Sequence, residues 1–223
     1  MPFLIVHTYV GLHYDKDYWH TNGGCFPDSI HLIDNDLGHP KMRKLVKLLE
    51  KKKVNKHFTN GMKTHLALDV YFHPRYIFPK REQLAKEFNI PLRTAEGYIE
   101  TALDMIYDKK YPKIKREIRK AAKLYDVKTM ASYLSLVTDT PINKIEKALK
   151  DSIKVITRKK PYSILSMIRG SLLLRKYSKL PIRSYKLLSV KRIHDRSIEI
   201  IKDDCEEEIN LAIKKIRILR NKV

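Results

Sequence analysis

KREQLAKEFNIPLRTAEGYIETALDMI, residues 80–106, carries two helical patterns separated by a short turn. Asn89-Ile90-Pro91 supplies the turn, because proline breaks a helix interior but is accepted in a first turn. The layout fits a helix-turn-helix pair, whose second helix directs polar residues to base edges in the DNA major groove. The pattern therefore predicts that Arg93, Thr94 and Tyr98 face DNA. A generic pair of packed helices is the alternative.

The chain after Pro79 is expected to be helical almost to its end. Prolines separate the apolar patterns of helical spacing, and they therefore mark the helix boundaries. The expected helices span residues 80–88, 92–107, 113–126, 128–137, 142–157, 162–176, 182–189 and 194–219. These spans predict a mainly α fold.

The N-terminal part is harder to assign. Residues 3–10 are rich in β-branched and aromatic side chains, which favour a strand. A helix is expected over residues 40–53, whereas residues 61–73 fit either a strand or a buried helix. A strand over 61–73 would give an α/β N-terminal domain followed by a helical helix-turn-helix domain, and a helix there would favour an all-helical chain.

Two further helix-turn-helix units are predicted, over residues 129–156 and 182–201. In the second unit the turn carries Lys191 and Arg192, and the next helix opens just before Arg196. These cations would face phosphates or guanine edges. The alternative is a solvated basic corner.

The net charge points to a polyanionic partner. Lys and Arg number 46 against 25 Asp and Glu, which gives a formal charge of +21. Such an excess favours binding to nucleic acid through release of condensed counterions. A basic helix with Lys113, Arg116 and Lys120, and the cluster Arg158-Lys159-Lys160, would track phosphates, although a solvated surface is the usual meaning of such runs.

Cysteine use and hydropathy indicate a soluble intracellular protein. Cys25 and Cys205 are far apart and form no CxxC motif, which fits a reducing compartment. No apolar run reaches the length of a membrane span, and no secretory signal is recognisable. The predicted location is the cytoplasm of an archaeal or virus-infected cell, or the nucleus in a eukaryote.

A metal-dependent enzyme is a further hypothesis. His65 and His73 flank Asp69, as in a nuclease-like metal cluster. Isolated histidines more often have structural roles, and the sequence has no phosphate-binding glycine loop, GxSxG or HExxH motif. We therefore assign no catalytic residue, no metal ligand and no cofactor from the sequence alone.

The chain also shows an internal repeat with an offset of roughly 100 residues, a length typical of duplicated domains. Helix 40–53 corresponds to 142–157, 61–73 to 162–176, 80–88 to 182–189, and 92–107 to 194–203. The agreement lies in the order and spacing of elements rather than in identical residues.

This layout resembles the two cyclin-like repeats of transcription factor IIB and archaeal transcription factor B. SILSMIRGSLLLRKY (163–177) is similar to the family's third helix, and Arg158-Lys159-Lys160-Pro161 resembles the basic loop before it. The resemblance implies two helical bundles, each ending in a helix-turn-helix, and DNA contacts from Lys191, Arg192, His194 and Arg196. The family's zinc ribbon is absent, because there is no CxxC pair.

The sequence thus predicts a double-stranded DNA-binding protein that acts in transcription initiation or its regulation. The resemblance implies a TATA-binding protein or RNA polymerase as further partners, and no membrane. The expected domains are an N-terminal extension (1–27), a first repeat (28–107), a basic connector (108–127) and a second repeat (128–223). The alternatives are a nucleic-acid enzyme with an N-terminal metal-dependent part, and a viral protein that coats a genome.

Overall fold

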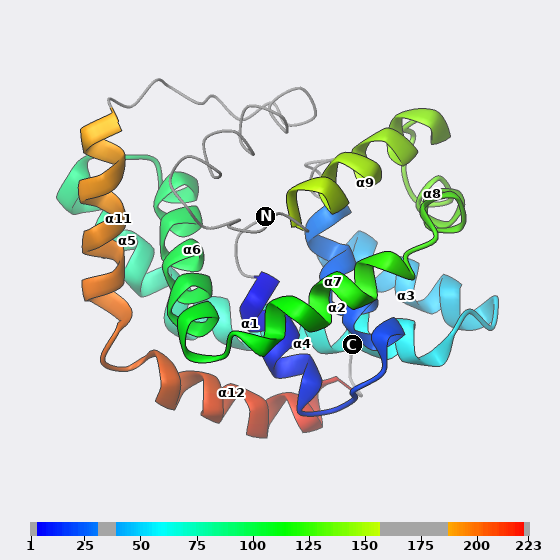
Figure 1. Cartoon of the computed structure of the whole chain (residues 1–223), viewed down its shortest axis with the longest axis horizontal. Coiled ribbons are helices and arrows are strands. Elements are labelled where there is room, and N and C mark those ends of the chain that lie inside the picture. The colour runs from blue at the N-terminus through cyan, green and yellow to red at the C-terminus, as the bar shows by residue number, and fades with distance from the viewer. Residues whose placement is uncertain (1–3, 31–38, 157–186, 221–223) are drawn as a thin grey trace.

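The computed structural model describes residues 4–30, 39–156 and 187–220, and every regular element in these ranges is a helix (Figure 1). The prediction of a mainly α fold is confirmed. The elements are α1 (Leu4–Leu12), α2 (Tyr18–Ile30), α3 (His39–Lys51), α4 (Lys56–Phe72), η1 (His73–Ile77), α5 (Phe78–Phe88), α6 (Leu92–Lys110), α7 (Lys113–Lys123), α8 (Val127–Leu134), α9 (Ile142–Ile156), α11 (Leu187–Ile201) and α12 (Cys205–Leu219).

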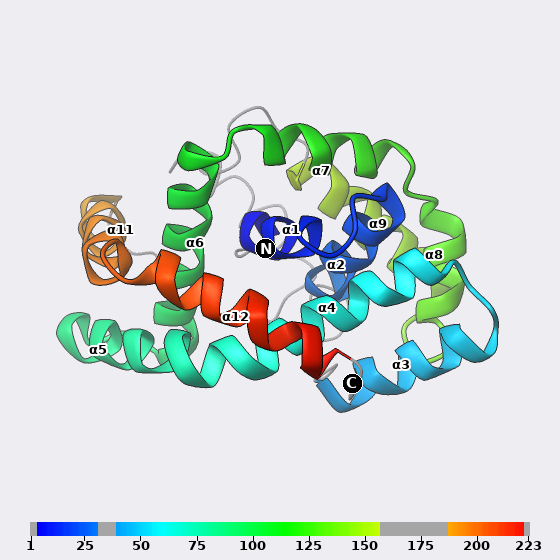
Figure 2. The same ribbon diagram turned by 90° about the horizontal axis from the view of Figure 1, so that it is seen from below.

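Helices α2 and α4 cross with their backbones in contact. A methyl group added at Gly23 would overlap the carbonyl of Phe58, and one added at Gly61 would overlap the carbonyl of His20. Glycine is required at both positions because no side chain fits between the backbones. Helix α1 packs on both helices, α6 and α7 contact α1, and α12 packs across α4 (Figure 2).

Apolar side chains form two cores that share α4. Leu68 and Phe72 belong to the core built with α1, α6, α11 and α12. Phe58 and Met62 belong to the core built with α2, α3, α8 and α9. Burial on several sides fixes the rotation of α4 about its own axis, and this fixes where its polar residues point.

The turn η1 joins α4 to α5 as a π-helical segment. Pro74 has no N–H to donate within the helix, and the N–H of Phe78 bonds to the carbonyl of His73, five residues earlier. Single π turns inside helices often occur at functional sites. Here the wider turn begins at His73.

Two predictions for the N-terminal part are resolved. Residues 61–73 are helical up to Phe72, as one alternative required. The strand predicted over residues 3–10 is wrong, because Leu4–Leu12 form α1. Ile5, Val6 and Val10 are fully buried, so tertiary packing outweighs their strand propensity. No strand occurs in the described part of the chain, and the α/β alternative is therefore wrong.

The C-terminal helices also differ from the prediction. The single helix expected over 194–219 is two helices, α11 and α12, which are separated at residues 202–204. Helix α11 runs without interruption through Lys191 and Arg192, so the turn predicted there is wrong. The helices expected over 162–176 and most of 182–189 lie outside the described residues. The domain boundaries expected after residues 27 and 107 fall inside α2 and α6.

Candidate metal centre

Helix α4 and the start of η1 present a row of polar side chains. His65, Asp69 and His73 follow one another at intervals of four residues, so they share one face of the helix. His65 Nε2 lies 3.1 Å from Asp69 Oδ2, and His73 Nε2 lies 3.4 Å from Asp69 Oδ1. Both oxygens of Asp69 therefore face an imidazole.

Helix α6 faces this row with a second one. Glu96, Glu100 and Asp104 are also four residues apart. His73 Nδ1 lies 3.3 Å from Glu96 Oε1, and His73 Nε2 lies 3.6 Å from Glu100 Oε1. Asp104 Oδ1 instead accepts hydrogen bonds from the amides of Ile5 and Val6, at 2.9 and 3.1 Å, and so holds the start of α1.

Helices α1 and α2 complete the site. His7 Nε2 lies 3.0 Å from Asp69 Oδ1, and the ring of His7 stacks on that of His65 with a centroid separation of 3.7 Å. Asp28 Oδ2 lies 3.7 Å from His7 Nδ1, and Asp28 Oδ1 lies 4.0 Å from His65 Nε2. We call the seven residues the acid–histidine cluster: His7, Asp28, His65, Asp69, His73, Glu96 and Glu100.

The cluster contains two sets of three metal-ligand atoms. In one set, atoms of His7, Asp28 and His65 lie within 4.8 Å of one another, and the same holds for His73, Glu96 and Glu100 in the other. Asp69 contacts histidines of both sets, so its carboxylate would be available to an ion held by either set. Imidazole and carboxylate are ligands for Zn²⁺ and Mn²⁺. The geometry thus suits a centre for two divalent ions.

An outer contact orients His65, and a buried oxygen of Asp28 has no hydrogen-bond partner. His65 Nδ1 lies 2.7 Å from the carbonyl oxygen of Gly24, which can only accept, so Nδ1 donates and Nε2 faces the cluster. Such outer contacts are typical of metal-bound histidines. Asp28 Oδ2 is inaccessible to solvent and makes no hydrogen bond. A buried carboxylate oxygen without a hydrogen bond is costly, and a bound cation would remove that cost.

The protonation of the cluster reflects its crowding. Burial works against charge on His65 and His73, but the neighbouring carboxylates, Asp69 foremost, raise the pKa of each to about 9. Burial raises the pKa of Glu100 to about 8, whereas burial and the nearby His65 lower the pKa of His7. Protons on His65, His73 and Glu100 therefore balance the buried carboxylates, and divalent ions would displace them.

The floor of the cluster is buried and its rim reaches the surface. His7, His65 and Asp69 are 4, 2 and 7% exposed, whereas the side chains of Glu96 and Asp28 are 20 and 17% exposed. Glu96 and Asp28 are therefore the cluster residues with the greatest access to solvent.

Two arginines lie near the acidic row of α6. Arg81 forms an ion pair with Glu96, and its guanidinium lies 3.7 Å from the centre of the Phe78 ring. Arg93 shares the face of α6 that carries Glu96 and Glu100, one turn earlier. Arg93 is exposed and makes no ion pair among the described residues.

The residues predicted to face DNA lie on several helices. Arg93 is exposed on α6, while Thr94 and Tyr98 are half-buried. On α7, Lys113 and Arg116 are exposed, and Lys120 bonds to Glu117 at 3.1 Å. The cluster Arg158-Lys159-Lys160 lies outside the described residues.

The predicted DNA contacts on α11 are mostly engaged within the protein. Lys191 pairs with Asp195 at 2.6 Å, and Arg196 pairs with Glu87 at 3.0 Å. The Arg192 guanidinium lies 5.7 Å from the centre of the Phe88 ring. His194 is buried, with Nε2 2.8 Å from Met105 Sδ, because α11 packs on α6. The prediction that His194 faces DNA is therefore corrected.

Most residues of the cluster were missed from the sequence. The pattern His65-x3-Asp69-x3-His73 is present in the sequence, but isolated histidines favour structural roles, and Glu96-x3-Glu100-x3-Asp104 lies in the helix predicted to read DNA. Two rows of ligand-type residues at four-residue spacing were the available signal. No local sequence pattern points to His7 or Asp28, because these residues join the site only through tertiary packing.

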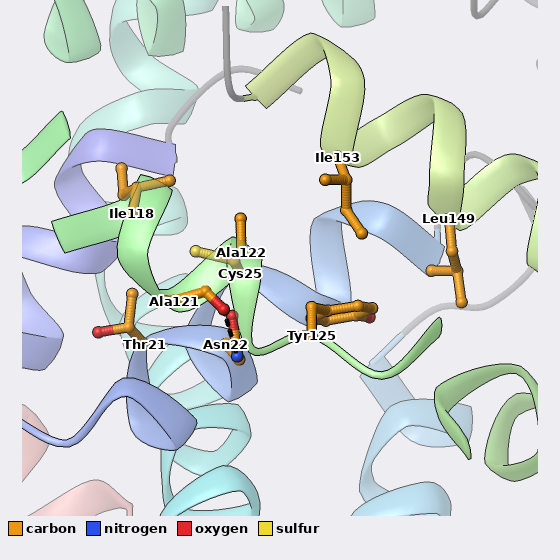
Figure 3. A pocket seen from close by; sticks show the side chains of 9 residues that line it. All are labelled: Thr21, Asn22, Cys25, Ile118, Ala121, Ala122, Tyr125, Leu149 and Ile153. Atoms are coloured by element: carbon orange, nitrogen blue, oxygen red, sulfur yellow. Dashed lines mark hydrogen bonds between the residues drawn. The ribbon is translucent and has the colours of Figure 1, made fainter. Parts of the chain in front are cut away.

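A separate small cavity lies between α2, α7 and α9 (Figure 3). Its volume is about 20 Å³, which is room for a single water. Asn22 Nδ2 donates to the carbonyl of Ala121 at its wall, at 2.9 Å, and Cys25, Tyr125 and Leu149 also line it. The cavity is too small for a substrate.

Comparisons with family models, with curated proteins and with solved structures find no match to this chain. Among the described helices, none combines the length and the apolar character needed to cross a bilayer.

Proposed function

We propose that this chain is a metal-dependent hydrolase that cleaves phosphoesters at a centre for two divalent ions. The observation that carries the proposal is the acid–histidine cluster, in which Asp69 stands between two sets of three ligands. Two neighbouring divalent ions would supply an activated water and stabilise charge on the attacking and leaving oxygens.

The chain's own residues prepare this centre. The carbonyl of Gly24 orients His65, and the carboxylate of Asp104 holds the first turn of α1, which carries His7. Burial of His7, His65 and Asp69 keeps bulk water away from the floor of the site. A rigid, buried ligand set favours one coordination geometry over the alternatives.

A phosphoester is the substrate class that the charge distribution favours. The formal charge of +21 raises the local concentration of anionic substrates. Arg93 lies one turn before Glu96 on the cluster face of α6, and it has no described ion pair to hold it. A guanidinium at that place is suited to a phosphate oxygen.

The test measures hydrolysis of bis(p-nitrophenyl) phosphate by protein loaded with Zn²⁺ or with Mn²⁺. Hydrolysis is expected for the wild type, and Asp69→Asn is expected to reduce it to the uncatalysed rate. Glu82→Gln is the control, because Glu82 is exposed on α5 outside the cluster and its loss should leave the rate unchanged.

A different outcome would point to redox chemistry. Carboxylates and histidines from several helices also hold di-iron centres. Oxygen consumption by the Fe²⁺-loaded protein, with no phosphoester hydrolysis under any metal, would contradict the hydrolase proposal.

A second candidate function is sequence-specific DNA binding in transcription. The corner between α5 and α6 favours it, because Asn89 ends α5 in a left-handed conformation (φ 49°, ψ 51°) and Arg93 and Thr94 then open α6. This candidate includes the two cyclin-like repeats, with double-stranded DNA and a TATA-binding protein or RNA polymerase as partners. Enrichment of one sequence from a random duplex library, lost in Arg93→Ala, would support it.

The position of Glu96 and Glu100 favours the hydrolase over this second candidate. Both residues contact His73 from the helix that would have to read DNA. Helix α6 thus contributes carboxylates to the cluster. A DNA-recognition helix has no need of such inward carboxylates, because it reads DNA through an exposed face.

A further inference from the structure

Helix α3 and the loop after it expose a dense group of cations. We call this group the α3 basic surface, and it consists of Arg43, Lys44, Lys47, Lys51, Lys52, Lys53 and Lys56. All seven are exposed, and none forms an ion pair with another described residue. The single acid between positions 43 and 56 is Glu50, which pairs with Lys63 of α4 at 2.6 Å.

These cations are not needed for the packing of α3. The opposite face of the helix is buried in the second core through Met42, Leu45, Val46 and Leu49. Arg43 and Lys47, and also Lys47 and Lys51, stand four residues apart, where like charges destabilise a helix. The repulsion is uncompensated in the free protein, so an anionic partner would relieve it.

Three cations on other helices form ion pairs with acids of neighbouring elements. Lys80 pairs with Asp204 at 2.5 Å, Arg75 with Glu208 at 3.0 Å, and Arg196 with Glu87 at 3.0 Å. Those pairs join α5, η1 and α11 to one another or to the start of α12, and α5 and α11 lie at the opposite end of the molecule from α3 (Figure 1). The α3 basic surface therefore keeps its charge available for another molecule.

The shape of the surface suits a phosphate backbone. The cations of α3 lie on the nine helical residues from Arg43 to Lys51, which extend over about 13 Å and match roughly four base pairs of duplex at about 3.4 Å per phosphate on each strand. Lys53, with φ 52°, turns the chain beyond the helix end, and Lys56 opens α4. The cations thus continue past α3 to the start of α4, and the intervening Val54 packs against the second core.

We infer that the α3 basic surface binds the sugar–phosphate backbone of double-stranded nucleic acid without reading its sequence. An anionic membrane fits less well, because helices that lie on membranes insert apolar side chains and α3 exposes no large apolar residue. The inference is independent of the hydrolase proposal, since none of the seven cations belongs to the acid–histidine cluster.

The test measures binding of a fluorescent DNA duplex of about 20 base pairs by anisotropy, from about 50 to 200 mM salt. The variant Lys44→Gln/Lys47→Gln/Lys51→Gln is compared with Lys86→Gln/Lys109→Gln/Lys202→Gln, which removes the same charge from exposed positions far from α3 in the sequence. Thermal unfolding is followed for both, and gels check that the duplex stays intact.

The wild type is expected to bind with a steep salt dependence. Each lost phosphate contact lowers the slope of log K against log salt by about 0.9, so the α3 variant should lose between two and three units of slope and the control variant less than one. Equal losses in the two variants would overturn the inference, as would absent binding at low salt. It would also be overturned if the α3 variant bound duplex normally but lost binding to vesicles containing phosphatidylserine.

Discussion

The acid–histidine cluster and the α3 basic surface use charge in opposite ways. In the cluster, four carboxylates meet three imidazoles at 3.0 to 4.0 Å, with most of the side chains shielded from water. On the α3 basic surface, seven exposed cations accompany a single acid, which is already paired with Lys63. The net charge of +21 thus describes the surface, whereas the candidate chemistry lies where acids outnumber bases. An excess of one charge indicates a class of partner, but it does not locate a reactive site.

Removing one ligand from either set of the cluster should have the largest effect on phosphoester hydrolysis. His7→Ala removes a ligand from one set, and Glu100→Ala removes one from the other. Each variant is expected to keep one divalent ion and to lose at least about 100-fold in phosphoester hydrolysis, since one ion supplies several kcal/mol of stabilisation. Metal content and rate are measured on the same sample. Two retained ions with an unchanged rate would remove that residue from the ligand set.

Disturbing the helix crossing below the cluster should have the next largest effect. Gly61→Ala places a methyl group against the carbonyl of His20 and is expected to lower the free energy of unfolding by about 3 kcal/mol or more. Gly97→Ala is the matched control in α6, where nothing lies within 4 Å, and it should raise stability by about 0.5–1 kcal/mol. Urea denaturation measures both. Equal effects would argue against the close contact of α2 with α4.

The support of α1 by α6 should matter for metal affinity. Asp104→Ala removes the acceptor for the amides of Ile5 and Val6, and His7 lies next to them. We expect metal affinity to fall about 10- to 100-fold, as for other outer contacts of metal ligands. Asp104→Asn keeps a carbonyl oxygen and should restore most of the affinity. The salt dependence of DNA binding should stay unchanged in both, because α3 is not involved.

The pH dependence of folding stability should differ between the metal-free and the metal-loaded protein. The pKa values of about 9 for His65 and His73 lie above their unfolded values, so the native state without metal holds extra protons. Its stability should therefore fall as pH rises from about 6.5 to 9, and Glu100, with a pKa of about 8, acts in the same direction. Metal affinity should rise over the same range, because protons compete with the ions.

Thermal unfolding at several pH values, with and without Zn²⁺, measures this difference. Metal-free protein whose melting temperature rises between pH 6.5 and 9 would contradict the assigned protonation of the cluster.

Local sequence patterns were enough to predict the helical class, because proline positions and apolar spacing are properties of short segments. They failed at residues 3–10, where Ile5 and Val6 have strand propensity but are buried in a helix by their neighbours. They also failed at Lys191, where basic residues suggested a turn inside a continuous helix.

The candidate site was only partly visible for a similar reason. His65, Asp69 and His73 lie on one helix, so their spacing already predicts that they meet. Asp28 reaches them only because Gly61 lets α2 approach α4 closely, and His7 reaches them only because α1 packs on both. A single sequence does not encode such contacts in any local pattern.

The most direct test of the central claim is the number of metal ions per chain. Protein incubated with Zn²⁺ or Mn²⁺ and then desalted is analysed by inductively coupled plasma mass spectrometry, beside Asp69→Asn and the control Glu82→Gln. We predict two ions per chain for the wild type and the control, and fewer than one for Asp69→Asn. A wild type that retains no ion, or an Asp69→Asn variant that retains two, would contradict the two-ion centre.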